Sequence, residues 1–205
     1  MIVVCLDMEG VLVPEIWIEV SKRTGIAALA RTTRDEPDYD KLMRYRLALL
    51  DEHGLKLPDL QAVIKDMGPM PGAREFLDGL RACYQLVILS DTFYEFAQPL
   101  MLQLGWPTLF CHRLETDAAG RVTNYHLRMP DPKRHAVEAL RGLNFRTIAA
   151  GDSFNDVSML KTADAGIFFC PPQAIAAQFP QFPVTRDYAA LRAAIDAAAA
   201  PDPGH

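Results

Sequence analysis

Two segments of this sequence carry acidic residues directly after an apolar stretch. LDMEG supplies Asp7 and Glu9 after MIVVC, and GDSFND supplies Asp152 and Asp156 after RTIAA. Side chains two positions apart on a strand share a face, so Asp7 and Glu9 point the same way if the strand continues that far. Ligands of open α/β sheets bind beyond the carboxyl ends of the strands, and we expect the acids to meet there in one crevice.

Carboxylates held close together repel and raise one another's pKa values. A hard divalent cation resolves this conflict, and Mg²⁺ typically takes one or two carboxylates, some waters and a substrate phosphate. The two acidic motifs therefore predict half of a metal–phosphate site. The alternative interpretation, acids that cap strand ends and face water, is weaker for the two motifs together than for either alone.

Two further segments point to phosphate. In LSDTFYEF, Ser90 and Asp91 stand where a strand ends and a helix begins, and the Ser90 hydroxyl and the free N–H groups of the helix start can hold an anionic oxygen. In DPKRHAV, Lys133 stands in the first turn of a helix, where a cation opposes the helix dipole, so we expect it to have another partner. The structural alternatives are an N-cap serine and an ordinary surface lysine.

The bulk composition limits the partners and the compartment. The 205 residues are 50% hydrophobic with a net charge of −5, which suits one domain with a full core, or a core plus a small insert. Without a basic patch we expect no nucleic-acid partner. Without an apolar run near the ~20 residues of a membrane span, we expect no membrane contact. The apolar N-terminal residues are predicted to be a strand and not a signal peptide.

The cysteines are scattered and give no sign of a metal site. They form no CxxC pair, and no histidine stands at zinc-ligand spacing. We expect small buried side chains in a reducing compartment, and hence a cytoplasmic protein. The four residues are Cys5, Cys83, Cys111 and Cys170.

The order of the elements predicts the fold class, α/β with a doubly wound parallel sheet. Continuous apolar runs bounded by turn residues are typical of buried parallel strands. Four such runs alternate with helical patterns. The predicted strands are 2–8, 85–91, 146–153 and 165–170, and the predicted helices are 71–84, 92–105, 131–143 and 154–164.

Two other segments have patterns of their own. Residues 112–129 alternate around DAAG and predict a β-hairpin lying beside the main sheet. The tail, residues 193–205, is predicted to be a last helix that frays into disorder, with nothing catalytic in it.

Residues 14–70 do not fit the alternation of strands and helices. Their amphipathic stretches have no strand between them, and an insert directly after the first strand is best explained as a lid over what that strand presents. We therefore expect a core of residues 1–13 and 71–205 and a helical cap of residues 14–70. The three amphipathic stretches are residues 14–26, 39–54 and 57–67.

LDMEGVL, ILSDT, DPKR and GDSFND occur in the order and spacing of the haloacid dehalogenase superfamily of phosphatases, and the chain resembles that superfamily over roughly residues 1–185. The resemblance implies its Rossmann-like core. The early helical insert is similar to the cap of phosphoserine phosphatases. The longer stretch LDMEGVLVPEIW, with LSDTFYEF and AAGDSFND, is similar to the bacterial group of bifunctional phosphoserine phosphatases and homoserine phosphotransferases.

The resemblance implies that Asp7 is a nucleophile, forming an aspartyl-phosphate that water hydrolyses. Mg²⁺ would be held by Asp7, Asp152 and the main-chain carbonyl of Glu9. Glu9 would protonate the leaving serine oxygen and then take a proton from the attacking water. Most of the superfamily has Asp at this position, and the extra methylene of Glu9 moves the acid forward. Asp156 would orient the water shell of the metal or Lys133.

The same resemblance assigns the groups that hold the phosphoryl oxygens. Ser90, Lys133 and the N–H groups near Asp91 and Gly10 would spread the charge of the transferring group. Asn155 would add a further hydrogen bond.

Substrate choice is expected to come from the cap. The resemblance to phosphoserine phosphatases places Glu15 near the substrate ammonium and Arg46 near its carboxylate, which a guanidinium can bind with two hydrogen bonds. Arg44 is the alternative to Arg46. The small-molecule substrate implied is O-phospho-L-serine, with L-homoserine as a second acceptor. Another small phosphate, such as a sugar or nucleotide, and a non-catalytic binding module are the remaining alternatives.

Overall fold

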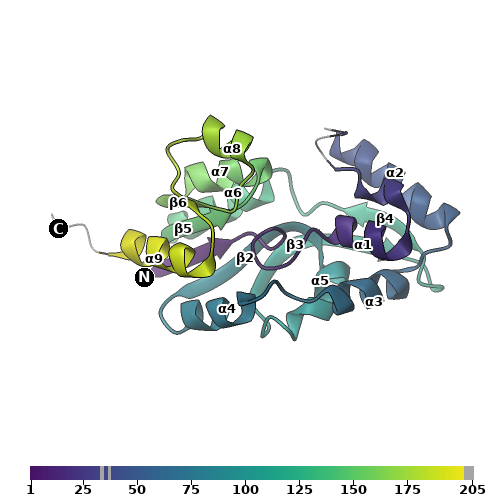
Figure 1. Ribbon diagram of the computed structural model, residues 1–205, viewed down its shortest axis with the longest axis horizontal. Helices are drawn as coiled ribbons and strands as arrows, with labels where there is room; N and C mark the ends of the chain where they lie inside the picture. The colour runs from purple at the N-terminus through teal and green to yellow at the C-terminus, as the bar shows by residue number, and fades with distance from the viewer. Residues whose placement is uncertain (33–34, 37, 201–205) are drawn as a thin grey trace.

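A single seven-stranded sheet forms the centre of the described chain, in the order β4-β3-β2-β1-β5-β6-β7 (Figure 1). The computed structural model describes residues 1–32, 35–36 and 38–200. All neighbouring strands pair in parallel except β3 and β4. The predicted α/β class with a parallel sheet is confirmed. The elements are β1 (Ile2–Leu6), α1 (Ile16–Thr24), η1 (Ala27–Ala30), α2 (Tyr39–Glu52), α3 (Leu57–Met67), α4 (Ala73–Arg81), β2 (Gln85–Phe93), α5 (Tyr94–Met101), β3 (Thr108–Thr116), β4 (Val122–His126), α6 (Pro132–Gly142), β5 (Arg146–Gly151), η2 (Phe154–Asp156), α7 (Val157–Thr162), β6 (Ala165–Phe169), α8 (Gln173–Gln178), β7 (Val184–Thr185) and α9 (Tyr188–Ala199).

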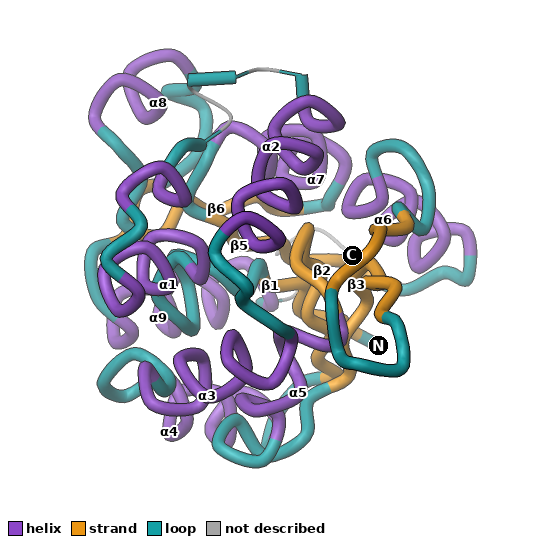
Figure 2. Tube along the Cα trace, turned by 90° about the vertical axis from the view of Figure 1, so that its right-hand side faces the viewer, coloured by secondary structure: helices purple, strands orange, loops and turns teal. Residues whose placement is uncertain are grey.

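The central strands are apolar on both faces because helices cover both. Val4 and Leu6 of β1 belong to a core with residues of α4, α5 and α9, whereas Val3 and Cys5 belong to a second core with α6 and α7. Figure 2 shows α3, α4 and α5 together on one side of the strands. Burial on both faces explains the continuous apolar runs in the sequence.

The segment between β1 and α4 is helical. Its α2 begins at the N-cap Asp38, whose carboxylate accepts the Lys41 N–H over 3.2 Å. The Arg44 guanidinium donates to the Asn124 side chain of β4 over 2.9 Å, which ties α2 to the β3–β4 hairpin. The third helix, α3, packs on α5.

Two predicted placements need correction. The hairpin exists, but it does not lie beside the sheet, because β3 pairs with β2 in parallel through its first half and with β4 through its second. The helix after Ser90 also begins later than expected. β2 continues to Phe93, which pairs with His112, and α5 begins at Tyr94.

Smaller differences concern exposure and short elements. The strand β7 and the helix α8 were not predicted. Cys5 and Cys111 are buried as expected, whereas the expectation is wrong for Cys83 and Cys170, which are exposed at loops. The last helix ends at Ala199, and the expectation for the end of the tail falls on residues outside those described. Among the described helices, none combines the length and apolar character needed to cross a membrane.

Candidate active site

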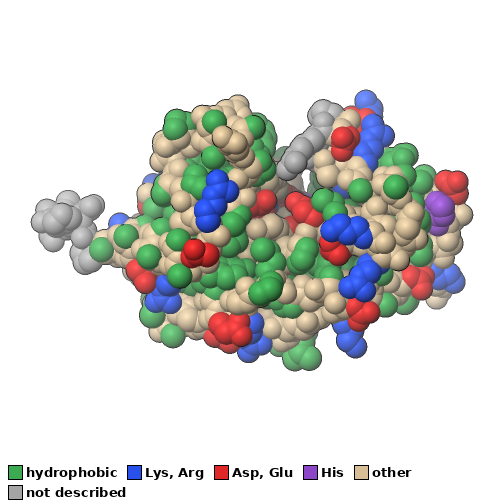
Figure 3. All heavy atoms as spheres, in the orientation of Figure 1, with side chains coloured by type: hydrophobic (Ala, Val, Ile, Leu, Met, Phe, Trp, Pro, Cys, Tyr) green, Lys and Arg blue, Asp and Glu red, His purple; other side chains and the backbone are tan. Residues whose placement is uncertain are grey.

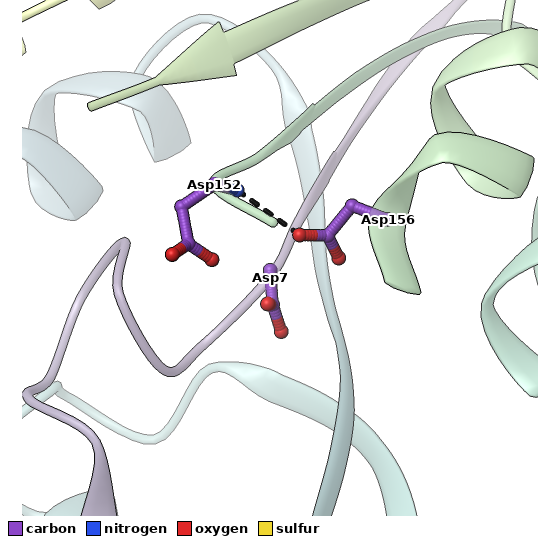
Figure 4. Close-up of side chains that lie close together, drawn as sticks. All are labelled: Asp7, Asp152 and Asp156. Atoms are coloured by element: carbon purple, nitrogen blue, oxygen red, sulfur yellow. Dashed lines mark hydrogen bonds between the residues drawn. The ribbon is translucent and has the colours of Figure 1, made fainter. Parts of the chain in front are cut away.

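The acidic motifs converge because their strands are neighbours. β1 lies between β2 and β5, with Leu6 in register with Ile88 and Ala150, so Asp7 and Asp152 follow adjacent strand ends. Carboxylate oxygens of Asp7, Asp152 and Asp156 lie within 4.8 Å of one another (Figure 4). In the space-filling view, acidic side chains are visible in a hollow between the lobe of α6–α8 and that of α1 and α2 (Figure 3).

Lys133 supplies positive charge to this cluster. It stands in the first turn of α6, and its Nζ lies 2.7 Å from Oδ1 of Asp156, 2.9 Å from Oδ1 of Asp7 and 3.5 Å from Oδ2 of Asp91. The side chain is 2% exposed. Lys133 therefore has the additional partner that was expected, a set of carboxylates, which compensates for its unfavourable position relative to the helix dipole. The alternative of an ordinary surface lysine is wrong.

Burial and repulsion shift the pKa values of the cluster. Burial raises the pKa of Asp7 well above its ordinary value, and Asp156 adds to this, while Lys133 opposes it. Burial, then Asp156 and Glu15, raise the pKa of Asp152 to about 7. Burial would lower the pKa of Lys133, but Asp156, Asp7 and Asp91 outweigh it and raise it. The single positive charge of Lys133 therefore does not offset the burial of these carboxylates and the repulsion between them.

Asp156 holds the loop after β5 in shape. Its Oδ2 accepts the N–H groups of Asp152 and Ser153 over 3.0 and 3.1 Å, while its Oδ1 contacts Lys133. Both oxygens are therefore engaged within the protein. The Lys133 contact is the one expected if Asp156 orients that side chain.

Glu9 is half-buried in the turn between β1 and α1. Its carboxylate accepts the Ile16 N–H over 2.9 Å, at the first turn of α1. Burial and the neighbouring Glu15 raise its pKa to about 7, against the opposing effects of hydrogen bonds from Ile16 and Thr92 and the charge of Arg46. A carboxyl group with such a pKa can both donate and accept a proton near neutral pH.

Gly10 allows the chain to turn closely past Asp152. Its φ is +74°, and a Cβ at this position would lie 2.4 Å from the Asp152 carboxylate. Its N–H donates to the Val13 carbonyl over 2.8 Å. The turn therefore uses the Gly10 N–H itself, and the expectation that N–H groups near Gly10 bind a phosphoryl group stays a prediction.

Ser90 and Asp91 lie within β2, so the N–H groups beside them are not those of a helix start. Ser90 is buried, and its hydroxyl accepts the Thr92 N–H over 3.2 Å. The Asp91 carboxylate accepts a 2.8 Å hydrogen bond from Asn155. Burial would raise the pKa of Asp91, but Lys133, Asn155 and His112 outweigh it and hold it well below its usual range.

Arg46 and Arg44 differ in where α2 places them. Arg46 is 6% exposed, stacks over the Trp17 ring at 4.6 Å and donates to the Arg31 carbonyl over 2.8 Å. Its Nε is buried without a hydrogen-bond partner in the described residues. Burial lowers its pKa to about 10, opposed by Tyr39, Glu9 and Glu15. Arg44 instead lies exposed against the hairpin.

Glu15 is exposed at the N-cap of α1, close enough to Glu9 and Asp152 to raise the pKa values of both. Three residues near the site were not predicted: Thr92, Tyr39 and His112. His112 is 3% exposed, and its Nε2 lies 3.7 Å from Oδ1 of Asp91. Thr92 is the last residue of the ILSDT motif, which was a usable signal.

The donor set fits a hard divalent cation. It consists of carboxylate oxygens, which Mg²⁺ prefers, and two of the carboxyl groups have pKa values raised by crowding and burial. The glycine turn leaves no room for a side chain against Asp152. Because both oxygens of Asp156 are engaged, Asp7 and Asp152 are the carboxylates best placed to coordinate the ion.

This fold and this crevice are those of a phosphate-processing hydrolase superfamily. Residues 2–164 match the haloacid dehalogenase-like hydrolases, and the chain belongs to this family. The resemblance found in the four motifs is confirmed, and the chain is an enzyme.

Within this family, the chain is similar to several phosphoserine phosphatases. The chain is 60% identical over 190 residues to a phosphoserine phosphatase of Pseudomonas syringae pv. tomato, covering 93% of this chain and 80% of that protein. It is 59% identical to the phosphoserine phosphatase ThrH of Pseudomonas aeruginosa, covering 93% of each. A substrate-bound phosphoserine phosphatase structure matches in fold with a TM-score of 0.75 at 22% identity, covering 95% of this chain and 97% of that one.

Proposed function

We propose that this enzyme hydrolyses O-phospho-L-serine to L-serine and phosphate in a Mg²⁺-dependent reaction through an aspartyl-phosphate on Asp7. The observation that carries the proposal is the buried Arg46 of α2, whose Nε has no hydrogen-bond partner in the described residues and whose charge acts on the Glu9 carboxylate. A buried, unsatisfied donor is costly, and a substrate carboxylate would satisfy it. The names of the two Pseudomonas relatives support the same substrate.

The first step is an in-line displacement at phosphorus. An oxygen of Asp7 forms the bond to phosphorus as the bond to the serine oxygen breaks, and Glu9 gives its proton to that oxygen. The raised pKa of Glu9, about 7, supports this role because much of the group is protonated at neutral pH. Lys133 holds Asp7 in position through its 2.9 Å contact.

The second step hydrolyses the aspartyl-phosphate. Glu9, now ionised, accepts a proton from the attacking water, whose oxygen bonds to phosphorus as the bond to Asp7 breaks. Ser90, Lys133 and Asn155 are the groups proposed to hold the phosphoryl oxygens. Mg²⁺, held by Asp7, Asp152 and the main-chain carbonyl of Glu9, would offset the repulsion between Asp7 and the phosphate.

Selectivity for the amino acid is assigned to the segment after β1. Arg46 would bind the carboxylate and Glu15 the ammonium, and residues 14–70 would act as the cap over a core of residues 1–13 and 71–205. A cap that excludes water would favour transfer over hydrolysis. Transfer to L-homoserine is the second candidate, supported by the likeness to the bifunctional group and to ThrH. A cytoplasmic location stays a prediction.

The test is phosphate release from O-phospho-L-serine with Mg²⁺, with and without excess L-homoserine, with phosphohomoserine followed by mass spectrometry. O-Phosphoethanolamine, which lacks the carboxylate, is the matched control substrate. Turnover of O-phospho-L-serine well above that of the control supports the proposal. Equal turnover of both would exclude the amino-acid assignment of Arg46, and phosphohomoserine formed at the expense of phosphate would establish the second acceptor.

A further inference from the structure

The hydroxyl of Tyr39 is a polar group at the crevice that the proposed reaction does not use. Tyr39 is the first residue of α2, and its hydroxyl donates to the main-chain carbonyl of Asp91 in β2 over 3.5 Å. Its ring packs edge-on against Tyr125 of β4, with 6.0 Å between the ring centroids. The ring is therefore held by the hairpin while the hydroxyl faces the strand that carries Ser90 and Asp91.

The charges around this hydroxyl belong to both ends of the crevice. Burial raises the pKa of Tyr39 above its ordinary value, Asp91 and Glu9 add to the shift, and Arg46 opposes it. The hydroxyl therefore keeps its proton at neutral pH and acts as a donor. Asp91 follows Ser90, which is proposed to hold the phosphoryl group, and this part of the crevice is called the phosphoryl end. Arg46 is proposed to bind the substrate carboxylate, and its part of the crevice is called the carboxylate end.

The present hydrogen bond of Tyr39 is easily replaced. A separation of 3.5 Å between neutral groups is at the weak limit of hydrogen bonding. It is the one hydrogen bond of this hydroxyl within residues 1–32, 35–36 and 38–200. A bond to an anionic phosphoryl oxygen is shorter and about twice as strong. The hydroxyl would therefore gain by exchanging the carbonyl for a phosphoryl oxygen.

The phosphoryl end also needs donors besides Lys133. That ammonium group is already shared by three carboxylates at 2.7, 2.9 and 3.5 Å. Tyr39 approaches from the opposite element, the cap helix α2, which lies beside β4 (Figure 1). It can supply a donor without displacing any contact of the acidic cluster.

We propose that Tyr39 is a substrate-binding residue whose hydroxyl donates a hydrogen bond to the phosphoryl group of a phosphate ester. The inference deepens the proposed function and rests on its phosphoryl site. It gives α2 two recognition groups on one face, two turns apart: Tyr39 for the phosphoryl group and Arg46 for the carboxylate.

The test is binding of inorganic phosphate to the Mg²⁺-loaded full-length chain, measured by isothermal titration calorimetry. Tyr39→Phe removes only the hydroxyl and is expected to weaken phosphate binding roughly tenfold. Tyr84→Phe is the matched control, because its hydroxyl bonds Asp196 over 2.7 Å on a surface formed by α4 and α9. It is expected to bind phosphate as the wild type does. Mg²⁺ affinity and the melting temperature are measured for each protein.

Each outcome decides between explanations. Unchanged phosphate affinity in Tyr39→Phe would overturn the proposal, and so would a parallel loss of Mg²⁺ affinity, which would indicate a distorted acidic cluster. A wild type that binds no phosphate would overturn both this inference and the proposed function. The wild type could also fail to turn over O-phospho-L-serine while Tyr39→Phe still weakens phosphate binding. That result would exclude O-phospho-L-serine as the substrate but would still support Tyr39 as a residue that binds the phosphoryl group.

Discussion

The Nζ of Lys133 lies 2.7 Å from Oδ1 of Asp156, and the two side chains are 2% and 0% exposed. Removing one partner of such a buried pair leaves an uncompensated charge, which costs far more than the loss of a surface ion pair. The same Asp156 carboxylate fixes the loop that carries Asp152 through two main-chain N–H groups. The pair thus links the stability of the fold to the geometry of the acidic cluster.

Asp156→Asn is therefore expected to lower both stability and activity. We expect a loss of about 3 kcal/mol in the free energy of unfolding, at the low end for a broken buried pair because Asp7 still contacts Lys133. Urea denaturation measures this loss. Asp78→Asn is the matched control, since Asp78 contacts Arg74 and Arg81 at 2.7 and 3.0 Å but is exposed. Similar losses in the two variants would contradict the structural role of Asp156.

The stability of the metal-free protein is expected to depend on pH. The pKa of Asp152 is raised to about 7, mainly by burial and by Asp156, above its ordinary value of 3.8. A group with a raised pKa in the folded state stabilises fully below the unfolded pKa and loses this contribution as pH rises through the folded pKa. The free energy of unfolding in EDTA should therefore fall between pH 5 and pH 8, by on the order of 2 kcal/mol.

Mg²⁺ and one substitution serve as controls for this pH dependence. Saturating Mg²⁺ favours ionised carboxylates, so it should reduce the fall, and Asp152→Asn in EDTA should also flatten it. Urea unfolding at several pH values decides the matter. A stability that rises steadily from pH 5 to pH 8 in EDTA would show that the acidic cluster does not carry the raised pKa values.

Three of the four motifs could be located from the sequence because each stands at the end of an apolar strand, whereas DPKR opens the helix α6. Strand ends in a parallel sheet share one edge, so the meeting of Asp7 and Asp152 follows from the order of elements alone. The path of β2 was harder to foresee, since SDTF suits a strand as well as a helix start. Its extension to Phe93 depends on pairing with His112, far along the chain.

His112 and Tyr39 could not be found from the sequence for the same reason. Each reaches Asp91 across a long separation, 52 residues in the case of Tyr39. Neither stands in a motif or at a metal-ligand spacing. Their positions depend on the way β3 continues from the sheet into the hairpin and supports α2, which local patterns do not encode.

Arg46→Ala is expected to raise KM for O-phospho-L-serine by roughly tenfold or more, because a charge-assisted bond to the carboxylate is lost. It should change KM for p-nitrophenyl phosphate, which has no carboxylate, far less. Steady-state kinetics with both substrates measures the difference. Arg44→Ala is the matched control from the same helix, since Arg44 contacts Asn124 and the Tyr125 ring. Equal effects of Arg46→Ala on both substrates would place Arg46 outside the substrate site.

Asp7→Asn is expected to abolish turnover, with kcat lowered on the order of a thousandfold or more, because the amide cannot serve as the nucleophile. The fold should survive. The pKa of Asp7 is raised by burial and by Asp156, so its ionised form is disfavoured in the metal-free protein. Phosphate release and circular dichroism measure the two effects. Residual activity above about a tenth of the wild type would remove Asp7 from the nucleophile role.

Gly10→Ala is expected to impair metal binding beyond its effect on the backbone. At Gly10, with φ +74°, a Cβ would lie 2.4 Å from the Asp152 carboxylate, so that carboxylate must move. Gly25→Ala is the matched control, because Gly25 has φ +73° and nothing within 4 Å of its Cβ position. Both variants should lose about 1–2 kcal/mol of stability from the left-handed backbone. Only Gly10→Ala should weaken Mg²⁺ binding and lower kcat, as measured by titrating activity with Mg²⁺. Equal Mg²⁺ dependence in the two variants would mean that the close contact between Gly10 and Asp152 has no part in shaping the metal site.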